Sequence, residues 1–296
     1  MSGPVAALLP GQRLHLQHGP IDLIIGADGD RAGAFMAATA RFETVLDELV
    51  AELPLLRQPV GQRPQNAVAR RMHKACTPHA YDDVVTPMAA VAGSVADEVL
   101  AAMVDAAPLT RAYVNNGGDI ALHLLGSARF TVGLGGLDGT ALGRVAIDAD
   151  SPVRGVATSG AGGRSLSLGI ADSVTVLARS AAAADVAATL IANAVDLPGN
   201  PAIRRQPACE VQPDSDLGDR LVTVGVGTLR EDEVTRALEA GLARAQAMRK
   251  RGLIEGASLM LRRQVRLVCH DAPQSGAVDI AHAGRPAAVG YSRTVN

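Results

Sequence analysis

The chain has 296 residues, 48% of them hydrophobic, and a formal net charge of −2 from 28 basic and 30 acidic side chains. This length and composition allow one large domain, or two closely packed ones, with a substantial core. The balanced charge and the 2% aromatic content, with no tryptophan, argue against nucleic acid as a partner, because nucleic acid is bound by basic surfaces and stacking side chains.

The cysteines and the N-terminus indicate the compartment. Cys76, Cys209 and Cys269 are widely spaced, odd in number and form no Cys-x-x-Cys pair, so we expect free thiols. The N-terminal sequence MSGPVAALLPGQR has no basic segment followed by a long apolar core, and no stretch reaches about 18 uninterrupted apolar residues. We therefore expect a cytoplasmic protein without a membrane span.

The N-terminal part of the chain predicts a hairpin followed by a long helix. Residues 14–17 and 21–25 are short apolar runs separated by a Gly-Pro turn. From 33 to 53 the apolar residues recur at helical spacing, and Pro54 is expected to end that helix. The next segment, 55–78, is basic and rich in proline. We interpret it as a solvated loop, with a clamp for phosphate or carboxylate as the alternative.

A second helix and a glycine-rich turn follow. Thr86-Pro87 is expected to begin a helix over 87–104, because proline suits the first turn of a helix. Strands at 112–114 and 120–125 then flank the turn Asn115-Asn116-Gly117-Gly118-Asp119. Two adjacent glycines indicate a backbone held close to another group, with a positive φ at one of them. A plain hairpin turn is the alternative, since Asn-Gly is a common hairpin sequence.

The most informative stretch runs from residue 154 to 193. A predicted strand leads into the turn Thr158-Ser159-Gly160-Ala161-Gly162-Gly163, an apolar run covers 173–178, and Ser180 begins an alanine-rich helix over 180–195. Three polar residues of that helix, Asp185, Thr189 and Asn193, lie four positions apart and so share one face. A solvated helix face is one explanation of this stripe, and a ligand site is the other.

The chemistry of the stripe suits a phosphate and a metal ion. Backbone N–H groups of the glycine-rich turn, with the Thr158 and Ser159 hydroxyls, can bind phosphate or a hydrated cation. Asp185 and Thr189 offer the hard oxygen ligands that Mg²⁺ prefers when it is shared with a substrate phosphate. One carboxylate and one hydroxyl are too few for an all-protein site. We therefore expect the metal to bind together with a substrate phosphate.

The C-terminal part predicts further regular elements and then a tail. Residues 198–213 are interpreted as a loop. The remaining predicted elements are strands at 130–134, 143–147, 221–226, 259–261 and 265–268 and a helix at 231–250. Beyond Asp271 the periodicity is weak. We expect a domain over residues 1–270 and a tail or surface arm over 271–296.

Several motifs in order resemble the ApbE superfamily, the FAD:protein FMN transferases. They are Asn115-x-Gly117-Gly118-Asp119, then Thr158-Ser159-Gly160, and then the run 173–176 leading to Asp185-x-x-x-Thr189. Longer segments, such as TPMAAVAGSVADEVL and GLIEGASLML, are similar to a cytoplasmic branch of that superfamily known only as uncharacterised ApbE-like proteins. The resemblance covers about residues 12 to 270.

The resemblance implies an α+β fold with antiparallel sheets and four main helices around a cleft that receives FAD, with Mg²⁺ at the pyrophosphate. It implies that Asp185 and Thr189 bind the metal, and that Asp119 is the catalytic residue that orients or deprotonates an acceptor hydroxyl. Arg164 is expected at the rim of the cleft, with Ser165 and Ser167. The residues expected to contact the nucleotide are Asn115, Gly117, Gly118, Thr158, Ser159, Gly160, Arg164 and Asn193.

The sequence also departs from the transferases. In that family a His and an Ile-Asp-Pro turn follow Thr-Ser-Gly, and residues 161–173 here contain neither. Three functions therefore stand: a Mg²⁺-dependent FMN transferase or related enzyme acting on a flavin dinucleotide, with a protein acceptor; a flavin-linked oxidoreductase; and a non-catalytic protein that binds a small ligand. The small-residue helix faces favour a homodimer.

Overall fold

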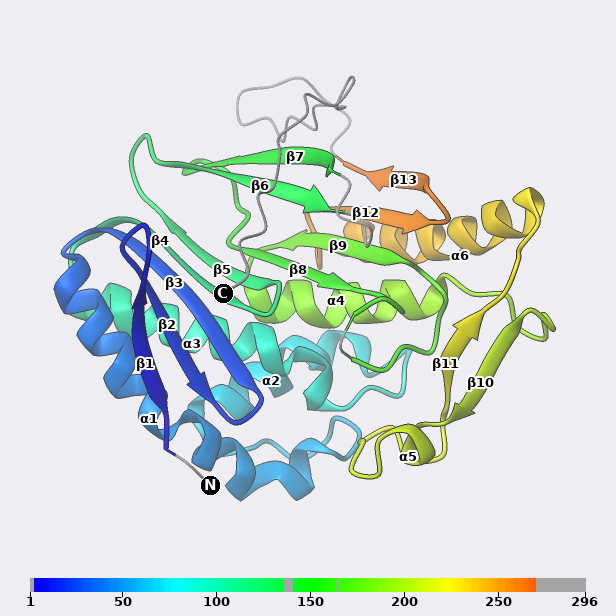
Figure 1. The fold of residues 1–296 in the computed structure, drawn as a ribbon, viewed down its shortest axis with the longest axis horizontal. Helices are drawn as coiled ribbons and strands as arrows, with labels where there is room; N and C mark the ends of the chain where they lie inside the picture. Colours follow the sequence, from blue (N-terminus) through cyan, green and yellow to red (C-terminus); the bar gives the residue numbers. More distant parts are fainter. Residues whose placement is uncertain (1–2, 136–140, 164, 270–296) are drawn as a thin grey trace, which may run out of the picture.

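A large antiparallel sheet spans the molecule in the computed structural model, which describes residues 3–135, 141–163 and 165–269. Its strand order is β1-β2-β3-β4-β5-β8-β9-β12-β13 (Figure 1). These strands are β1 (Val5–Leu9), β2 (Arg13–His18), β3 (Ile21–Gly29), β4 (Leu109–Asn116), β5 (Asp119–Leu124), β8 (Gly155–Ser159), β9 (Ser173–Ala178), β12 (Gly256–Leu261) and β13 (Gln264–Val268).

Helices cover one face of this sheet, and a hairpin covers part of the other (Figure 1). The helices are α1 (Arg31–Leu56), α2 (Ala67–Cys76), α3 (Val91–Ala106), α4 (Ala181–Ala194), α5 (Ala208–Val211) and α6 (Glu231–Lys250), with 3-10 turns η1 (Thr77–His79) and η2 (Pro87–Ala90). The hairpin is β6 (Arg129–Gly135) with β7 (Ala141–Asp148), and a second small sheet pairs β10 (Ile203–Pro207) with β11 (Leu221–Val226). The expected α+β fold with four main helices is confirmed.

The two largest of the four core clusters lie in the two halves of the sheet. One cluster joins β2, β3 and β4 to α1, α2 and α3, and it includes Leu23, Phe42 and Val99. A second joins β8, β9 and β12 to α4 and α6, and it includes Val176, Ile191 and Leu238. Because both clusters lie on the helix-covered face, the two halves meet where α3 packs against α4.

The sheet is narrowest between the two halves. β5 and β8 share only two residue pairs, Ile120↔Val156 and Ala121↔Gly155. β8 then continues to Ser159 in register with β9. The end of β8 therefore separates from the start of β5, and backbone groups on that edge of β8 are not part of a ladder with β5. This split places the Asn115–Asp119 turn beside the Thr158–Gly160 segment.

Two predictions about the segment after α1 were wrong. The helix does not end at Pro54 but runs through it to Leu56. Proline removes only the bond to the carbonyl of Val50, a residue that is 46% exposed and can turn that carbonyl to water. The expected loop over 55–78 contains helix α2, whose buried residues Val68, Ala69, Met72 and Cys76 form one apolar stripe.

The run formed by η2 and α3 (Pro87–Ala106) is long and apolar enough to cross a membrane by length and composition alone. Half of it is buried inside the fold, where Val95, Val99 and Met103 pack in the first core cluster. The run therefore has the packing of a core helix.

Candidate functional site

A tight hairpin turn presents Asp119 to the helix layer. Asn116 and Asp119 face each other across the β4–β5 turn, with φ of 65° at Gly117 and 116° at Gly118. These values favour glycine, as the sequence predicted. Asn115 accepts a hydrogen bond from the Gly118 N–H (2.8 Å) and so closes the turn. Side chains alternate along β5, so Asp119 points to the same face as buried Ala121, toward α3 and α4.

One peptide unit at the start of α3 is held from both halves of the molecule. The Asn116 amide, on β4, donates to the Ala92 carbonyl (3.1 Å). Asp185, on α4, accepts from the Gly93 N–H (3.0 Å). A Cβ at Gly93 would lie 2.3 Å from the Ala181 carbonyl oxygen, so only glycine lets the two helices approach this closely. The turn, α3 and α4 therefore converge on the Ala92–Gly93 peptide.

Each of these two helices caps the other. Asp97, on α3, accepts from the N–H groups of Ala181 (3.0 Å) and Ala182 (2.9 Å) in the first turn of α4. Asp185, on α4, accepts from the N–H groups of Ala92 and Gly93 in the first turn of α3. Carboxylates stabilise the free N–H groups and positive dipole of a helix N-terminus. Asp185 therefore has a structural role whatever else it does.

The two candidate carboxylates, Asp119 and Asp185, act on each other. Burial, and then the negative charge of Asp119, raise the pKa of the Asp185 carboxyl well above its usual range, against the backbone hydrogen bonds from Gly93 and Ala92. Asp97 contributes in the same direction. Asp185 nevertheless retains partial solvent access. Two partly buried carboxylates that raise each other's proton affinity favour a bound cation or a shared proton.

The remaining α4 residues of the stripe occupy different surroundings. Thr189 lies one turn beyond Asp185 on the same helix face and is half-buried. Asn193 lies two turns beyond Asp185, roughly 12 Å along the helix axis. Its side chain accepts from the Leu168 N–H (3.0 Å) and so fixes the end of the loop that leaves β8. Asn193 is therefore too far along α4 to share a metal with Asp185.

The side chains of the Thr158–Gly160 segment point to opposite faces of the sheet. Thr158 is exposed, and its hydroxyl lies 2.9 Å from that of Thr175 on β9. By strand alternation both point away from α4, whereas Ser159 shares the face of buried Ala157. Thr158 and Asp185 therefore lie on opposite faces of the sheet. They can meet a common ligand only around the split between β5 and β8.

Gly160 has a φ of 146°, and a Cβ there would lie 2.7 Å from the Asp172 carbonyl oxygen. The requirement for glycine at this position is therefore steric. Of the expected rim residues, Ser165 is exposed and Ser167 is buried. Arg164 lies outside the residues that the structure describes.

The donor set at Asp119, Asp185 and Thr189 fits Mg²⁺. Two carboxylates and a hydroxyl supply hard oxygen atoms, and an ionised carboxylate offers about four acceptor positions. The two N–H groups on Asp185 therefore leave acceptor positions free. Within the described residues no group of three or more His, Cys, Asp or Glu side chains could hold a metal. The set accordingly suits a metal that is completed by a substrate phosphate.

Comparison with known proteins identifies the class. Residues 6–267 match the family model described as AbpE bacteria. The chain is 31% identical over 230 residues to a UPF0280 protein of Methanothrix thermoacetophila, covering 73% of this chain and 87% of the relative. It is 35% identical over 178 residues to a UPF0280 protein of Methanopyrus kandleri, covering 58% and 69%. The chain therefore belongs to this ApbE-like family.

The fold is also similar to that of a solved structure, the flavin transferase ApbE from Vibrio cholerae. The TM-score is 0.50 at 13% sequence identity, covering 90% of this chain and 98% of that one. At this identity the similarity shows the fold alone. The family model over residues 6–267 confirms the predicted membership of the ApbE superfamily.

Sequence reasoning missed two residues of the site. Asn116, and not its neighbour Asn115, reaches from the turn to α3. Asp97 was not among the expected site residues, although it caps α4. Strand alternation gave a usable signal for Asn116, because it pairs with Asp119 and so shares its face. Asp97 had no local signal, since its partners lie 84 and 85 residues away.

Proposed function

We propose that the protein binds the pyrophosphate of a flavin dinucleotide together with Mg²⁺ at Asp119, Asp185 and Thr189, and transfers FMN to an acceptor hydroxyl. The observation that carries this proposal is the convergence of Asp119 and Asp185 beside the first turn of α3, at the positions of the family motifs. Family membership supports the nucleotide, and the donor set supports the metal.

The proposed reaction moves FMN from FAD to the acceptor hydroxyl and releases AMP. The acceptor oxygen forms a new bond to the FMN phosphorus, the bond to the bridging oxygen of the pyrophosphate breaks, and AMP leaves. When bound, Mg²⁺ polarises the phosphoryl oxygens and offsets their charge. Asp185 and Thr189 hold the ligand from α4. Asp119 takes the proton of the acceptor hydroxyl, because it lies at the open end of β5 and is partly exposed.

The backbone around the split orients the nucleotide. Space is open above Gly118, where a Cβ would meet no atom within 4 Å. The β8 edge beyond Val156 offers N–H groups toward the same opening. We assign phosphate or ribose contacts to Gly117, Gly118, Ser159 and Gly160. Asn193 positions the neighbouring loop through Leu168, and Asn115 preserves the turn.

The test compares two carboxylates that have the same structural role. Asp185→Asn keeps an oxygen acceptor for the α3 N–H groups but removes the charge, and Asp97→Asn makes the same change at the cap of α4. Calorimetric titration of FAD, with and without Mg²⁺, should show Mg²⁺-dependent binding in the wild type and in Asp97→Asn. We expect Asp185→Asn to lose about tenfold or more in affinity, the equivalent of roughly 1.4 kcal/mol.

Chromatography then shows whether FAD is converted to AMP and a flavinylated acceptor, or to AMP and free FMN when water is the acceptor. We expect Asp119→Asn to keep FAD binding and lose AMP release. If the Asp185 and Asp97 variants bind FAD equally well, Asp185 is a helix cap only and the metal-bridged proposal is wrong. Binding without AMP release in the wild type would favour the non-catalytic ligand-binding function.

A further inference from the structure

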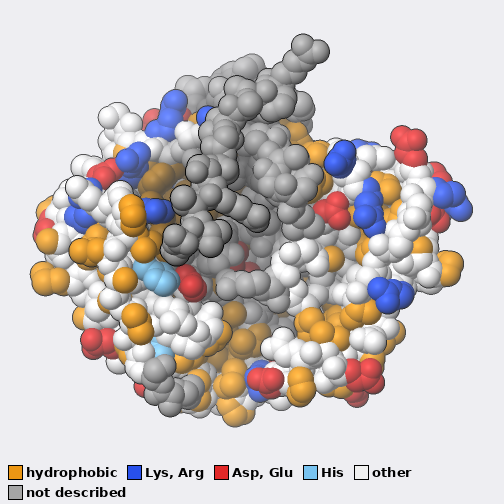
Figure 2. Space-filling model, in the orientation of Figure 1, with side chains coloured by type: hydrophobic (Ala, Val, Ile, Leu, Met, Phe, Trp, Pro, Cys, Tyr) orange, Lys and Arg blue, Asp and Glu red, His pale blue; other side chains and the backbone are white. Residues whose placement is uncertain are grey.

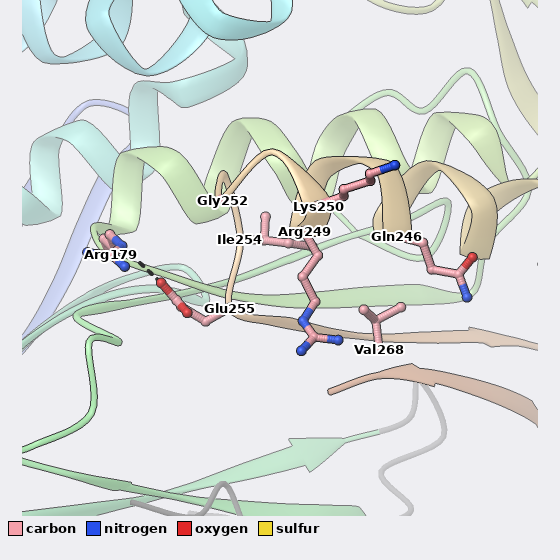
Figure 3. Close-up of a pocket in the computed structure, with 8 residues that line it drawn as sticks. All are labelled: Arg179, Gln246, Arg249, Lys250, Gly252, Ile254, Glu255 and Val268. Atoms are coloured by element: carbon pink, nitrogen blue, oxygen red, sulfur yellow. Dashed lines mark hydrogen bonds and ion pairs between the residues drawn. The ribbon is translucent and has the colours of Figure 1, made fainter. Parts of the chain in front are cut away.

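A cavity lies at the C-terminal end of α6 and shares no residue with the Asp119–Asp185 centre. It has a volume of about 360 Å³, which lies in the range of small-molecule sites. Arg249 and Lys250 of α6 line one side, and Arg179, just after β9, lines the other. Buried Ile254 and Val268 supply apolar surface. Figure 3 shows Arg249 extending from α6 into the space beside the strands.

The basic residues of α6 differ in their partners. Arg236 pairs with Asp232 on the exposed surface of α6. Arg244, and Arg251 just after the helix, pair with Asp83 and Asp82 of the segment after α2. Within the described part of the chain, Arg249 and Lys250 have no hydrogen-bond or ion-pair partner. Arg249 is only partly exposed, so its guanidinium gives up some hydration without a compensating acceptor.

The helix end does not need these two cations to satisfy its carbonyls. Gly252, with a φ of 71°, donates to the Arg249 carbonyl (2.8 Å), and Leu253 donates to the Met248 carbonyl (3.0 Å). This is the usual glycine-based end of a helix. The side chains of Arg249 and Lys250 are therefore available to an external partner, beyond their favourable position on the helix dipole.

The opposite side of the cavity is fixed. The Nε of Arg179 donates to Glu255 (2.9 Å), and Figure 3 shows this pair at the end of the cavity away from Gln246. The Glu255 side chain is 19% exposed, whereas that of Arg179 is 72% exposed. The pair holds the guanidinium in place and leaves its terminal nitrogens without a partner in the described structure. Three cations and one carboxylate give the lining a net charge of +2.

We propose that this cavity binds a compact phosphate-bearing anion at Arg249, with Lys250 at the rim and Arg179 at the far end of the cavity. A phosphate monoester carries a charge of about −1.5 to −2 at neutral pH, which matches the net charge of the lining. Guanidinium groups bind phosphate oxygens in a bidentate manner. The Ile254 and Val268 surface contacts the carbon part of the ester. A dicarboxylate, which divides its charge between two ends, fits this arrangement less well.

The test uses the full chain in EDTA, so that metal-dependent binding at the central site does not contribute. Inorganic phosphate and succinate are titrated by calorimetry at low ionic strength. We expect phosphate to bind saturably and more tightly than succinate. Arg249→Gln should raise the phosphate Kd about tenfold or more, because it removes charge-assisted hydrogen bonds to the phosphate oxygens. Arg236→Gln, on the same helix but outside the cavity, should leave it unchanged.

Glu255→Gln provides a second test, since it keeps the side-chain volume and raises the net charge of the lining. It should lower the phosphate Kd several-fold. Circular dichroism confirms that each variant is folded, and Arg179→Gln replaces Arg249→Gln if the latter does not fold. The proposal is overturned by three results: no saturable phosphate binding up to about 50 mM, a Kd that Arg249→Gln does not change, or an equal or better affinity for succinate.

Discussion

At the scale of single residues, His79 is a buried group whose protonation the fold opposes. It lies in η1 with 2% of its surface exposed. Burial, and then the positive charges of Arg244 and Arg251, lower its pKa from 6.5 to about 4, with Asp82 acting in the opposite direction. Asp83 pairs with Arg244 beside it. The histidine is therefore neutral in the folded protein at neutral pH.

This environment predicts a pH dependence of stability. Between about pH 6.5 and pH 4 the unfolded chain binds a proton at His79 that the folded chain does not, so the free energy of unfolding falls as the pH falls. The loss attributable to His79 is of the order of 2–3 kcal/mol. Urea unfolding followed by circular dichroism should show a steeper fall in the wild type than in His79→Gln.

His73→Gln is the matched control for this prediction, because His73 is a partly exposed residue of the adjacent helix α2. It should keep the pH slope of the wild type. Equal slopes in the wild type and in His79→Gln would show that the histidine does not control stability in this range.

At the scale of secondary-structure elements, the contact between α3 and α4 depends on Gly93. A methyl group there would lie 2.3–2.7 Å from backbone atoms of Ala181 and Ala182, and backbone cannot move aside as a flexible side chain can. We expect Gly93→Ala to destabilise the protein by about 1–3 kcal/mol. Gly133→Ala, at a β6 position with nothing within 4 Å, should change stability by less than about 0.5 kcal/mol.

Gly93→Ala also affects the candidate site, since the Gly93 N–H donates a hydrogen bond to Asp185. Thermal unfolding measures the loss of stability, and FAD titration measures the effect on the candidate site. A Gly93→Ala variant as stable as Gly133→Ala would contradict the close approach of the two helices.

Elements with strong local patterns were predictable, and those that depend on distant partners were not. The sequence predicted α4 from its alanine-rich run and α6 from its apolar stripe, and both helices lie where expected. Helix α2 was missed because prolines on both sides and five basic residues in the segment hid a short apolar face that is buried by η2, α1, α3 and α4. Strand β10 was missed because it is a strand only through its pairing with β11, and the register of that pairing shifts between Arg204 and Arg205.

In the candidate site, too, features set by local sequence were predictable and those set by distant residues were not. Glycine at 117, 118 and 160 was predictable, because turns and close approaches require it locally. The reciprocal capping of α3 and α4 was not, since Asp185 and Gly93 are 92 residues apart. The face of Thr158 was also beyond a motif comparison, because the β8–β9 register determines it.

At the scale of the whole molecule, the two core clusters and the central sheet form one closed unit that ends with β13. Val268 is the last residue of the second core cluster, and β13 pairs only with β12 in the described structure. The family model ends at residue 267. The boundary near residue 270 stays a prediction, and it is one that truncation can test.

A chain ending at residue 270 should fold to the same sheet and helices, since every described ladder and both cores are complete before that point. We expect its midpoint of thermal unfolding to lie within about 2 °C of that of the full chain, because it keeps every residue of the described core clusters. The matched control ends at residue 262. It removes β13 and with it the buried Val268 contact, and it should unfold at a clearly lower temperature.

FAD titration of the 270-residue chain then separates folding from binding. A fall of more than about 5 °C for that chain would mean that residues 271–296 are part of the folded unit. Unchanged stability with lost FAD affinity would instead assign them to the nucleotide site.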